Sequence, residues 1–332
     1  KRARACATYL FHTRVKLLEI EIQVLEAVIG VTRVRTTRFA DSYKVGAARV
    51  RADVNSFYMN TFLQVQSVLK NIVRDWSSVG AAEREQCYRP ILDAIEELFP
   101  ADDYTSLQEV RVLVPGAGLG RLAWEVAARG YYCQGNEFSL FMLFASNFVL
   151  NRCHEHTVHP WLHQYVNNMS CEHQLFAASF PDARPQPAQA AGFSMTAGDF
   201  LKVYTEPEEW SCVATCFFID CAPNVIEFIE RIYTILLPGG YWVNLGPLLY
   251  HYSDMPTENS IEPPYDLLLE IIRDIGFEVL ESGVKTKYAQ NPYSMMQHEY
   301  NSVFFVCRKP IPLRRSDRVG QPERITERSI AK

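Results

Sequence analysis

The residues best suited to chemistry begin with a glycine turn, Gly116-Ala117-Gly118-Leu119-Gly120, which follows the apolar run Val110 to Val114. Residues without a side chain let the backbone approach a ligand closely and adopt positive φ. A helix after the turn would point its first N–H groups at whatever is bound there. Gly116 and Gly118 are therefore candidate binding residues, although such turns also occur as plain structure.

Three acidic residues follow, each at or just beyond the end of a later apolar run: Glu137, Asp199 and Asp220. In an open parallel sheet, ligands bind beyond the carboxyl ends of the strands. A carboxylate at Glu137 can accept both hydroxyls of a ribose, or be a solvated loop acid. Asp199 beside Phe200 can bond the exocyclic amine of adenine while the ring covers its face. Together they indicate a nucleoside held by three strand ends, with a reactive carboxylate, Asp220, at the fourth.

Arg121 indicates which nucleoside is bound. A dinucleotide fingerprint, GxGxxG, would need glycine at this position, and this chain has arginine. The turn GxGxG is typical of ligands without a pyrophosphate. The sequence therefore favours S-adenosylmethionine over NAD, and it disfavours a nicotinamide dehydrogenase.

The elements that must position these residues alternate between strand and helix. Short apolar runs between turn residues predict strands at 110–114, 131–134, 193–196, 213–219, 241–245, 277–281 and 303–307. Helical spacing of apolar residues predicts helices at 121–129, 137–150, 225–236 and 265–275. The pattern predicts an α/β, Rossmann-like fold, with a mostly parallel sheet and the last two strands as an antiparallel edge hairpin.

The spacing of apolar residues predicts that residues 1–105 form a mostly helical N-terminal extension, with helices near 10–30, 55–75 and 81–98. The sheet domain is expected at 106–310, with an insertion near 155–192 that includes a Pro-, Ala- and Gln-rich segment. Residues 311–332 form a basic tail that is expected to be flexible. The helical extension could supply a homodimer surface.

Charge is distributed unevenly over the 332 residues, whose net charge is −5. Residues 1–51 carry +7 and residues 308–332 carry +5, which leaves −17 for residues 52–307. A nucleic-acid reader would carry its basic residues on the folded body, so no nucleic-acid partner is expected and the ends are interpreted as solvated tails. No apolar run approaches the ~20 residues of a membrane span. Nine cysteines without a CxxC pair indicate reduced thiols, hence the cytoplasm, with nuclear residence also open.

Several runs resemble the carnosine N-methyltransferases. These are VRDWS and AEREQCYRP within 72–90, PGAGLGRLAWE and QGNEFSLFMLFASNFVLN within 112–151, FSMTAGDF at 193–200, ATCFFID at 214–220 and NLGPLLYH at 244–251. The resemblance covers about 52–310, whereas residues 1–50 and the tail match nothing recognisable. It implies a seven-stranded methyltransferase sheet and methyl transfer from S-adenosylmethionine to the imidazole of the dipeptide carnosine, which gives anserine.

The same resemblance implies the site. By position, the cofactor contacts fall on Arg74, Gly116, Glu137, Asp199, Phe200 and Cys216, and the substrate contacts on Asp220, His251, Tyr288 and Tyr300. Two positions depart from the family pattern, with Asn71 where a Gln is expected and His298 where a Tyr is expected. Both bear on how tightly and how broadly the substrate is recognised.

Asp220 is expected to be the catalytic residue. A carboxylate that accepts the N–H of one imidazole nitrogen leaves the lone pair of the other free to attack, and it stabilises the positive charge that develops. His251 and Tyr300 would grip the rest of the dipeptide, and Tyr288 would form a wall for the ring. A packing role is the alternative for all three, and it is a stronger alternative for Tyr288 than for His251 and Tyr300.

The alternatives are a protein histidine, another small imidazole or amine as acceptor, and a non-catalytic cofactor-binding scaffold. No metal is expected. The stretch from Cys153 to His173 is rich in cysteine and histidine, but its spacing fits no zinc finger.

Overall fold

A computed structural model describes residues 50–152, 154–185, 192–255 and 259–312. The helix expected near 10–30 and almost all of the basic tail lie outside these residues. Among the described residues, none of the helices is both long and apolar enough to cross a bilayer.

A seven-stranded sheet forms the centre of the molecule, in the order β5-β2-β1-β6-β7-β9-β8. The strands are β1 (Arg111–Pro115), β2 (Tyr132–Glu137), β5 (Phe193–Ala197), β6 (Trp210–Cys216), β7 (Leu236–Gly246), β8 (Glu278–Thr286) and β9 (Tyr300–Arg308). The first five run parallel, and β9 is antiparallel to both β7 and β8. The predicted Rossmann-like methyltransferase sheet with an antiparallel edge hairpin is confirmed.

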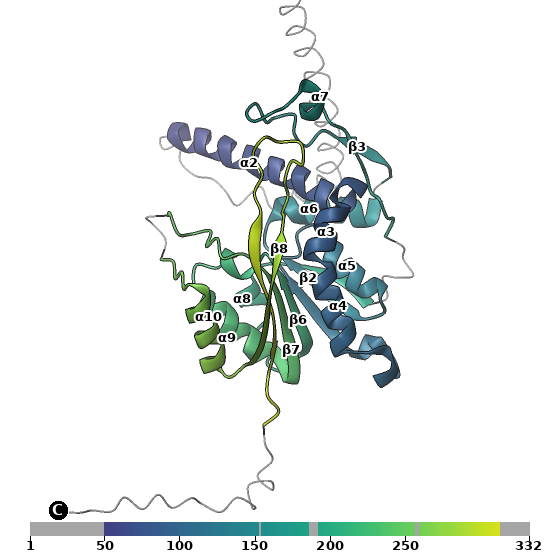
Figure 1. Ribbon diagram of the computed structural model, residues 1–332, viewed down its shortest axis with the longest axis vertical. Coiled ribbons are helices and arrows are strands. Elements are labelled where there is room, and N and C mark those ends of the chain that lie inside the picture. Colours follow the sequence, from purple (N-terminus) through teal and green to yellow (C-terminus); the bar gives the residue numbers. More distant parts are fainter. Residues whose placement is uncertain (1–49, 153, 186–191, 256–258, 313–332) are drawn as a thin grey trace, which may run out of the picture.

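Helices cover both faces of this sheet. The helices of the described residues are α2 (Val50–Trp76), α3 (Ala81–Cys87), α4 (Arg89–Leu98), α5 (Arg121–Ala128), α6 (Leu140–Arg152), α7 (Cys171–Gln174), α8 (Phe200–Val203), α9 (Val225–Ile235) and α10 (Tyr265–Ile275), of which α7 lies in the insertion, away from the sheet. Figure 1 shows α9 and α10 on one side of the sheet and α3, α4 and α5 on the other. The long helix α2 runs across the top, where the carboxyl ends of the parallel strands lie.

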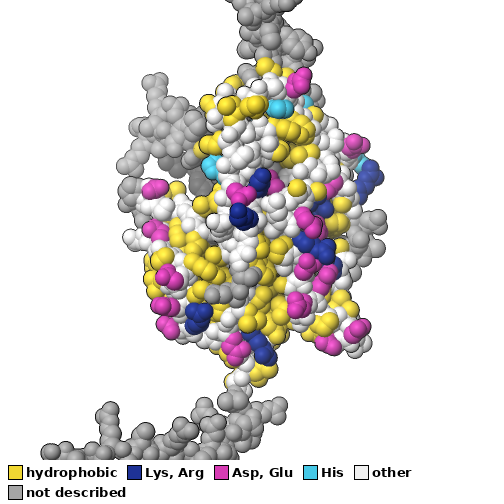
Figure 2. Space-filling model, viewed as in Figure 1, with side chains coloured by type: hydrophobic (Ala, Val, Ile, Leu, Met, Phe, Trp, Pro, Cys, Tyr) yellow, Lys and Arg dark blue, Asp and Glu magenta, His cyan; other side chains and the backbone are white. Residues whose placement is uncertain are grey.

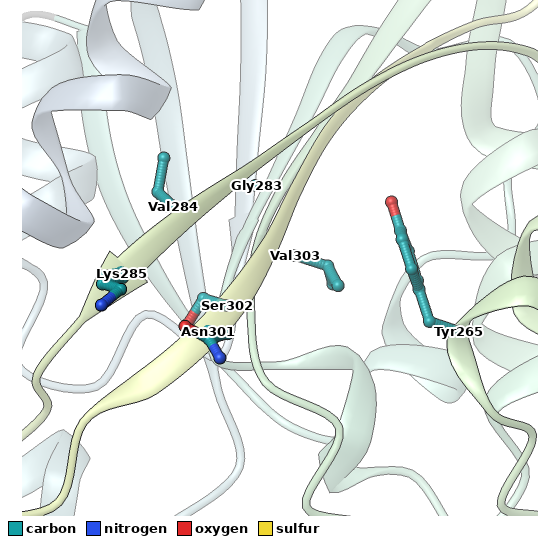
Figure 3. A pocket seen from close by; sticks show the side chains of 7 residues that line it. All are labelled: Tyr265, Gly283, Val284, Lys285, Asn301, Ser302 and Val303. Carbon is teal, nitrogen blue, oxygen red and sulfur yellow. The ribbon is translucent and has the colours of Figure 1, made fainter.

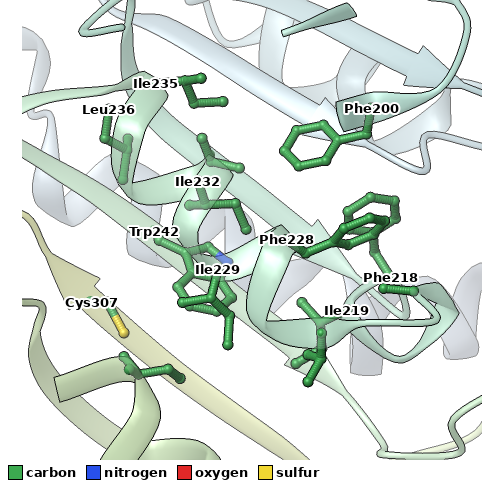
Figure 4. Close-up of a cluster of buried hydrophobic side chains, with 14 of the residues drawn as sticks. Phe200, Phe218, Ile219, Phe228, Ile229, Ile232, Ile235, Leu236, Trp242 and Cys307 are labelled. Atoms are coloured by element: carbon green, nitrogen blue, oxygen red, sulfur yellow. The ribbon is translucent and has the colours of Figure 1, made fainter. Parts of the chain in front are cut away.

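Side-chain alternation along the central strands divides the core in two. Val112 and Val114 of β1 pack under α4 and α5, whereas Leu113 packs with α9 and α10. On the α9 side, Ile229 and Ile232 lie against Trp242 of β7, close to the rings of Phe200 and other aromatic residues (Figure 4). A strand buried on both faces must be apolar throughout, which explains the continuous runs in the sequence.

Two parts of the fold differ from the predicted elements. The strand expected at 213–219 is β6, which begins at Trp210 and ends at Cys216. The chain leaves the sheet at Phe217, whose φ is +52°, and forms a 3₁₀ turn, Ile219–Cys221. The insertion also contains a small two-stranded antiparallel sheet of β3 (His156–Val158) and β4 (Ala178–Phe180) that the sequence pattern did not indicate.

A buried charge cluster fixes α2 to the sheet domain. Asp182 pairs with Arg84 of α3 at 2.5 Å and with Arg121 of α5 at 2.6 Å. Arg84 also donates to the carbonyl of Arg74, and Arg121 to that of Asp75, both near the end of α2. Arg121, which breaks the dinucleotide fingerprint, therefore positions the helix that lies over the strand ends.

Candidate functional site

A cavity of about 900 Å³ lies beyond the carboxyl ends of β1, β2 and β6. Helix α2 forms one wall and the segment after β8 contributes another part of the lining. Of the eleven site residues expected from the sequence, ten line this cavity: Arg74, Gly116, Gly118, Glu137, Asp199, Phe200, Cys216, Asp220, His251 and Tyr288. The cavity thus brings together residues that lie between positions 74 and 288 of the chain.

The glycine turn after β1 leaves its backbone open to the cavity. Gly116 has φ +66° and Gly118 has φ +54°, a region that strongly favours glycine. A Cβ on Gly116 would lie 2.4 Å from Cδ2 of Phe218, so a side chain there would displace that ring. The amide N–H of Gly118 donates to Oε2 of Glu137 at 2.9 Å, which ties the turn to the end of β2.

The carboxylates of Glu137 and Asp199 are held by backbone N–H groups. Oε1 of Glu137 accepts from the amide of Ser139 at 2.7 Å, and burial raises the pKa of this carboxyl. Oδ1 of Asp199 accepts from the amide of Leu201 at 3.0 Å and so caps α8. Each carboxylate oxygen has a second lone pair, so both groups can still accept hydrogen bonds from a ligand.

Arg74 enters the cavity from α2 and is only 5% exposed. Its Nε and Nη2 donate to the carboxylate of Asp75 at 2.6 and 3.0 Å, and its guanidinium lies 4.3 Å from the ring centre of Tyr288. Burial would lower the pKa of Arg74, but the Asp75 carboxylate holds it above the ordinary value. The remaining nitrogen, Nη1, is buried and has no hydrogen-bond partner within the described chain. It is a cationic donor left open for an anion.

Asp220 occupies the end of the cavity formed by the turn after β6. Its side chain is almost fully buried, and Oδ2 accepts from the amide of Leu249 at 2.9 Å. Its carbonyl accepts from the amide of His251 at 3.0 Å, which places the exposed His251 side chain at the rim. Burial raises the pKa of Asp220, while the Leu249 N–H and the nearby His251 act in the opposite direction.

Phe217 lines the same cavity, and the sequence argument did not single it out. Its ring stacks on Tyr288 with centroids 4.2 Å apart, and the ring of Tyr300 meets it edge-on at 6.0 Å. Tyr300 itself does not line the cavity. The available signal for Phe217 was its place between Cys216 and Asp220, at the end of a strand that points into the site.

The remaining residues of interest lie elsewhere or have local partners. Asn71 lines the cavity and donates to the carbonyl of Ser67 at 2.9 Å, whereas His298 is exposed and does not line it. In the cysteine- and histidine-rich stretch, His159 contacts the carbonyl of Leu175 and His173 stacks on Tyr293. Cys153 lies outside the described residues.

A second hollow of about 580 Å³ lies along the sheet edge and shares no residue with the first. Figure 3 shows Tyr265 standing apart from the β8 and β9 residues that complete the lining. On the face viewed in Figure 2, Lys and Arg side chains are interspersed with Asp and Glu. None of the predicted site residues lines this second hollow, and all of them except Tyr300 line the cavity under α2.

Comparison with known proteins identifies the family. The family model for carnosine N-methyltransferase matches residues 52–311. The chain belongs to the carnosine N-methyltransferase family. The resemblance inferred from the sequence motifs is thus confirmed, and its extent agrees with the region recognised from them.

Curated relatives in this family come from distant organisms. "Carnosine N-methyltransferase unmet" of Drosophila melanogaster is 57% identical over 254 residues, which cover 75% of this chain and 56% of that protein. The Mus musculus carnosine N-methyltransferase is 51% identical, over 74% of this chain and 63% of that protein. The carnosine N-methyltransferase of Schizosaccharomyces pombe is 40% identical, over 76% of this chain and 73% of that protein. The match to this chain spans between about half and three quarters of these relatives' length.

Proposed function

We propose that this protein transfers a methyl group from S-adenosylmethionine to the imidazole of carnosine, giving anserine and S-adenosylhomocysteine. The observation that carries the proposal is the single cavity that joins a nucleoside-type site to a buried carboxylate. Membership of the carnosine N-methyltransferase family supports the choice of both substrates.

The residues of the cavity fit S-adenosylmethionine. The open, buried Nη1 of Arg74 suits a carboxylate, and Glu137 can accept ribose hydroxyls. Asp199 and the ring of Phe200 suit the adenine, and the bare backbone at Gly116 and Gly118 allows close approach. When bound, this cofactor supplies an electrophilic methyl group on a sulfonium.

Asp220 controls the acceptor. An imidazole with an ordinary pKa of about 6.5 is mostly neutral at pH 7, so it needs orientation more than a strong base. The Asp220 carboxylate accepts the N–H of one ring nitrogen and leaves the other nitrogen's lone pair free. Because the ring gains positive charge as it is alkylated, the same carboxylate stabilises it and can take the proton.

The aromatic residues and His251 complete the acceptor end. His251, at the rim, is placed to donate to the peptide or carboxylate of a dipeptide. Tyr288 packs flat against Phe217 and beside Arg74, and burial raises its pKa to about 12, so it is a neutral wall. We infer that Tyr300 acts through Phe217, because its ring supports that side chain without reaching the cavity.

The test is methyl transfer from labelled S-adenosylmethionine to carnosine, histidine and a histidine-containing peptide. Asp220→Asn should lower turnover on carnosine by about 10²–10⁴-fold, since it removes the charge that orients and stabilises the ring. Cofactor affinity, measured by calorimetry, should stay unchanged. Asp254→Asn is the matched control, because Asp254 is exposed in the neighbouring turn and does not line the cavity.

The outcomes separate the alternatives. Full turnover in Asp220→Asn would remove this residue from the mechanism. Transfer to the peptide but not to carnosine would identify a protein histidine as the acceptor. Cofactor binding without transfer to any acceptor would indicate a non-catalytic scaffold.

A further inference from the structure

Three side chains of different metal-ligating types meet beside the acceptor end of the cavity. Asp220, Cys221 and His251 each offer one ligand atom, and these three atoms lie within 4.8 Å of one another. Within the described ranges, this is the one group of three or more His, Cys, Asp or Glu side chains whose ligand atoms lie close enough together to hold an ion. All three residues line the cavity, so the site opens into the space where an acceptor would lie.

The backbone already holds these side chains near one another. Asp220 and Cys221 belong to the same 3₁₀ turn, Ile219–Cys221. The turn that carries His251 is bound to Asp220 twice, through the amide of Leu249 at 2.9 Å and the amide of His251 at 3.0 Å. The buried Asp220 is thus fixed, whereas the His251 side chain is exposed at the rim of the cavity.

The donor set selects for a particular kind of cation. A thiolate, an imidazole and a carboxylate suit Zn²⁺, whereas Mg²⁺ and Ca²⁺ prefer oxygen alone. Ligand atoms on a tetrahedral zinc stand about 3.3–3.8 Å apart, given bond lengths of about 2.0–2.3 Å. Closing the observed group therefore takes a movement of about 1 Å, which a rotation of the His251 side chain can supply.

We propose that Asp220, Cys221 and His251 form an inhibitory zinc site, in which the bound ion reversibly blocks methyl transfer. The inhibition rests on the proposed function, because the ion would occupy the carboxylate that orients the acceptor. An imidazole in the fourth position would have its lone pair on zinc and could not attack. Zinc acts here as a reversible inhibitor, distinct from a resident cofactor.

The binding arm of the test uses cobalt(II) as a spectroscopic probe, with no acceptor present. The unmodified protein should show thiolate-to-cobalt charge-transfer absorption that zinc abolishes by displacement. Cys221→Ser should lose this absorption, because serine is nearly isosteric but a poor ligand for either ion. Cys171→Ser, at an exposed cysteine outside the cavity, should keep it.

The inhibition arm measures transfer to carnosine at free Zn²⁺ levels set by a chelator buffer, because carnosine itself binds zinc through its imidazole. Zinc should inhibit the unmodified protein and Cys171→Ser, and a chelator should restore activity. The zinc concentration needed to inhibit Cys221→Ser should rise by at least about 10–100-fold. Mutating a residue that only hydrogen-bonds to a metal ligand already costs that much affinity, and Cys221 is proposed to bind the ion itself. Inhibition of each variant is expressed relative to its own rate without metal.

Two results would overturn the zinc site: no thiolate–cobalt absorption in the unmodified protein, or full absorption and zinc sensitivity in Cys221→Ser. Failure of the proposed function looks different. Absorption that depends on Cys221, in a protein that methylates none of the acceptors, would support the metal site and refute the methyl transfer.

Discussion

Removing the charge of Asp182 should destabilise the whole fold, because two buried arginines depend on it. Arg84 and Arg121 are 8% and 7% exposed, and each meets one oxygen of this carboxylate. Asp182→Asn keeps the shape and one acceptor but leaves two guanidinium groups without their shared anion. Such groups cannot be neutralised by losing a proton, since arginine stays charged in proteins.

The expected loss in the free energy of unfolding is about 3 kcal/mol. Breaking a buried ion pair costs about 3–5 kcal/mol. The lower end applies because Arg84 keeps two carbonyl partners, and Arg121 keeps the Asp75 carbonyl and Glu125. If the free energy of unfolding falls by about 3 kcal/mol per M of urea, the midpoint of urea unfolding should fall by about 1 M.

The matched control is Asp93→Asn, which breaks the Arg89–Asp93 pair on α4. That pair has a similar N–O distance of 2.6 Å, but its side chains are 53% and 52% exposed. Solvent already screens it, so its loss should leave the midpoint within measurement error. Equal shifts in the two variants would refute the reasoning, because burial would then not decide the strength of these pairs.

Two further predictions concern the glycine turn and a half-buried histidine. Gly116→Ala should weaken S-adenosylmethionine binding by at least about tenfold, because left-handed strain of about 1–2 kcal/mol adds to the displacement of Phe218. Calorimetry should show no such effect for Gly283→Ala, whose Cβ would meet nothing within 4 Å, and equal affinities would contradict the role of the turn. Burial, assisted by the charge of Lys70, lowers the pKa of His163 to about 4. Its folded pKa lies below the unfolded value of about 6.5, so its stabilising contribution is full above pH 6.5 and is lost as the pH falls toward 4. After discounting for the partly solvated ring, about 1–2 kcal/mol should disappear over that range. Urea midpoints at pH 7 and pH 5 should therefore differ less in His163→Gln than in the unmodified protein, and an unchanged difference would refute the assignment.

Much of the sheet could be predicted because its strands are buried on both faces. The run at 110–114 and the helix at 265–275 have unambiguous patterns between turn residues, and the structure places β1 and α10 there. The predicted end of the strand at 213–219 was wrong because the apolar run continues past the strand, into residues that form the wall of a cavity. A positive φ at Phe217 ends β6, and composition gives no sign of it. The three-residue strands β3 and β4 depend on a pairing across the insertion, which local patterns do not contain.

Some residues of the candidate site could likewise be predicted from local sequence, and others could not. The rule that ligands bind at strand ends placed Gly116, Glu137 and Asp220 from the sequence alone. Arg74 was reached only through family resemblance, because nothing in the periodicity of α2 says that it covers the strand ends. Tyr300 was expected to touch the substrate; it does not line the cavity, and its ring meets that of Phe217 edge-on. Which way it faces depends on the register of β8 and β9, where Tyr300 pairs with Thr286.

The contact between α3 and the segment after β8 bears on how the protein is made. The Glu83 carboxylate accepts from the amide of Ala289, which lies 206 residues further along the chain. At about 5–20 residues per second, a ribosome needs about 10–40 s to synthesise that interval. A nascent chain would already contain α2 and the glycine turn during this time but would lack Tyr288, the wall at the acceptor end. The residues proposed to hold the cofactor, Arg74 to Cys216, all precede the β8–β9 hairpin, so the cofactor end of the cavity is synthesised first and an acceptor could bind only once the hairpin is complete.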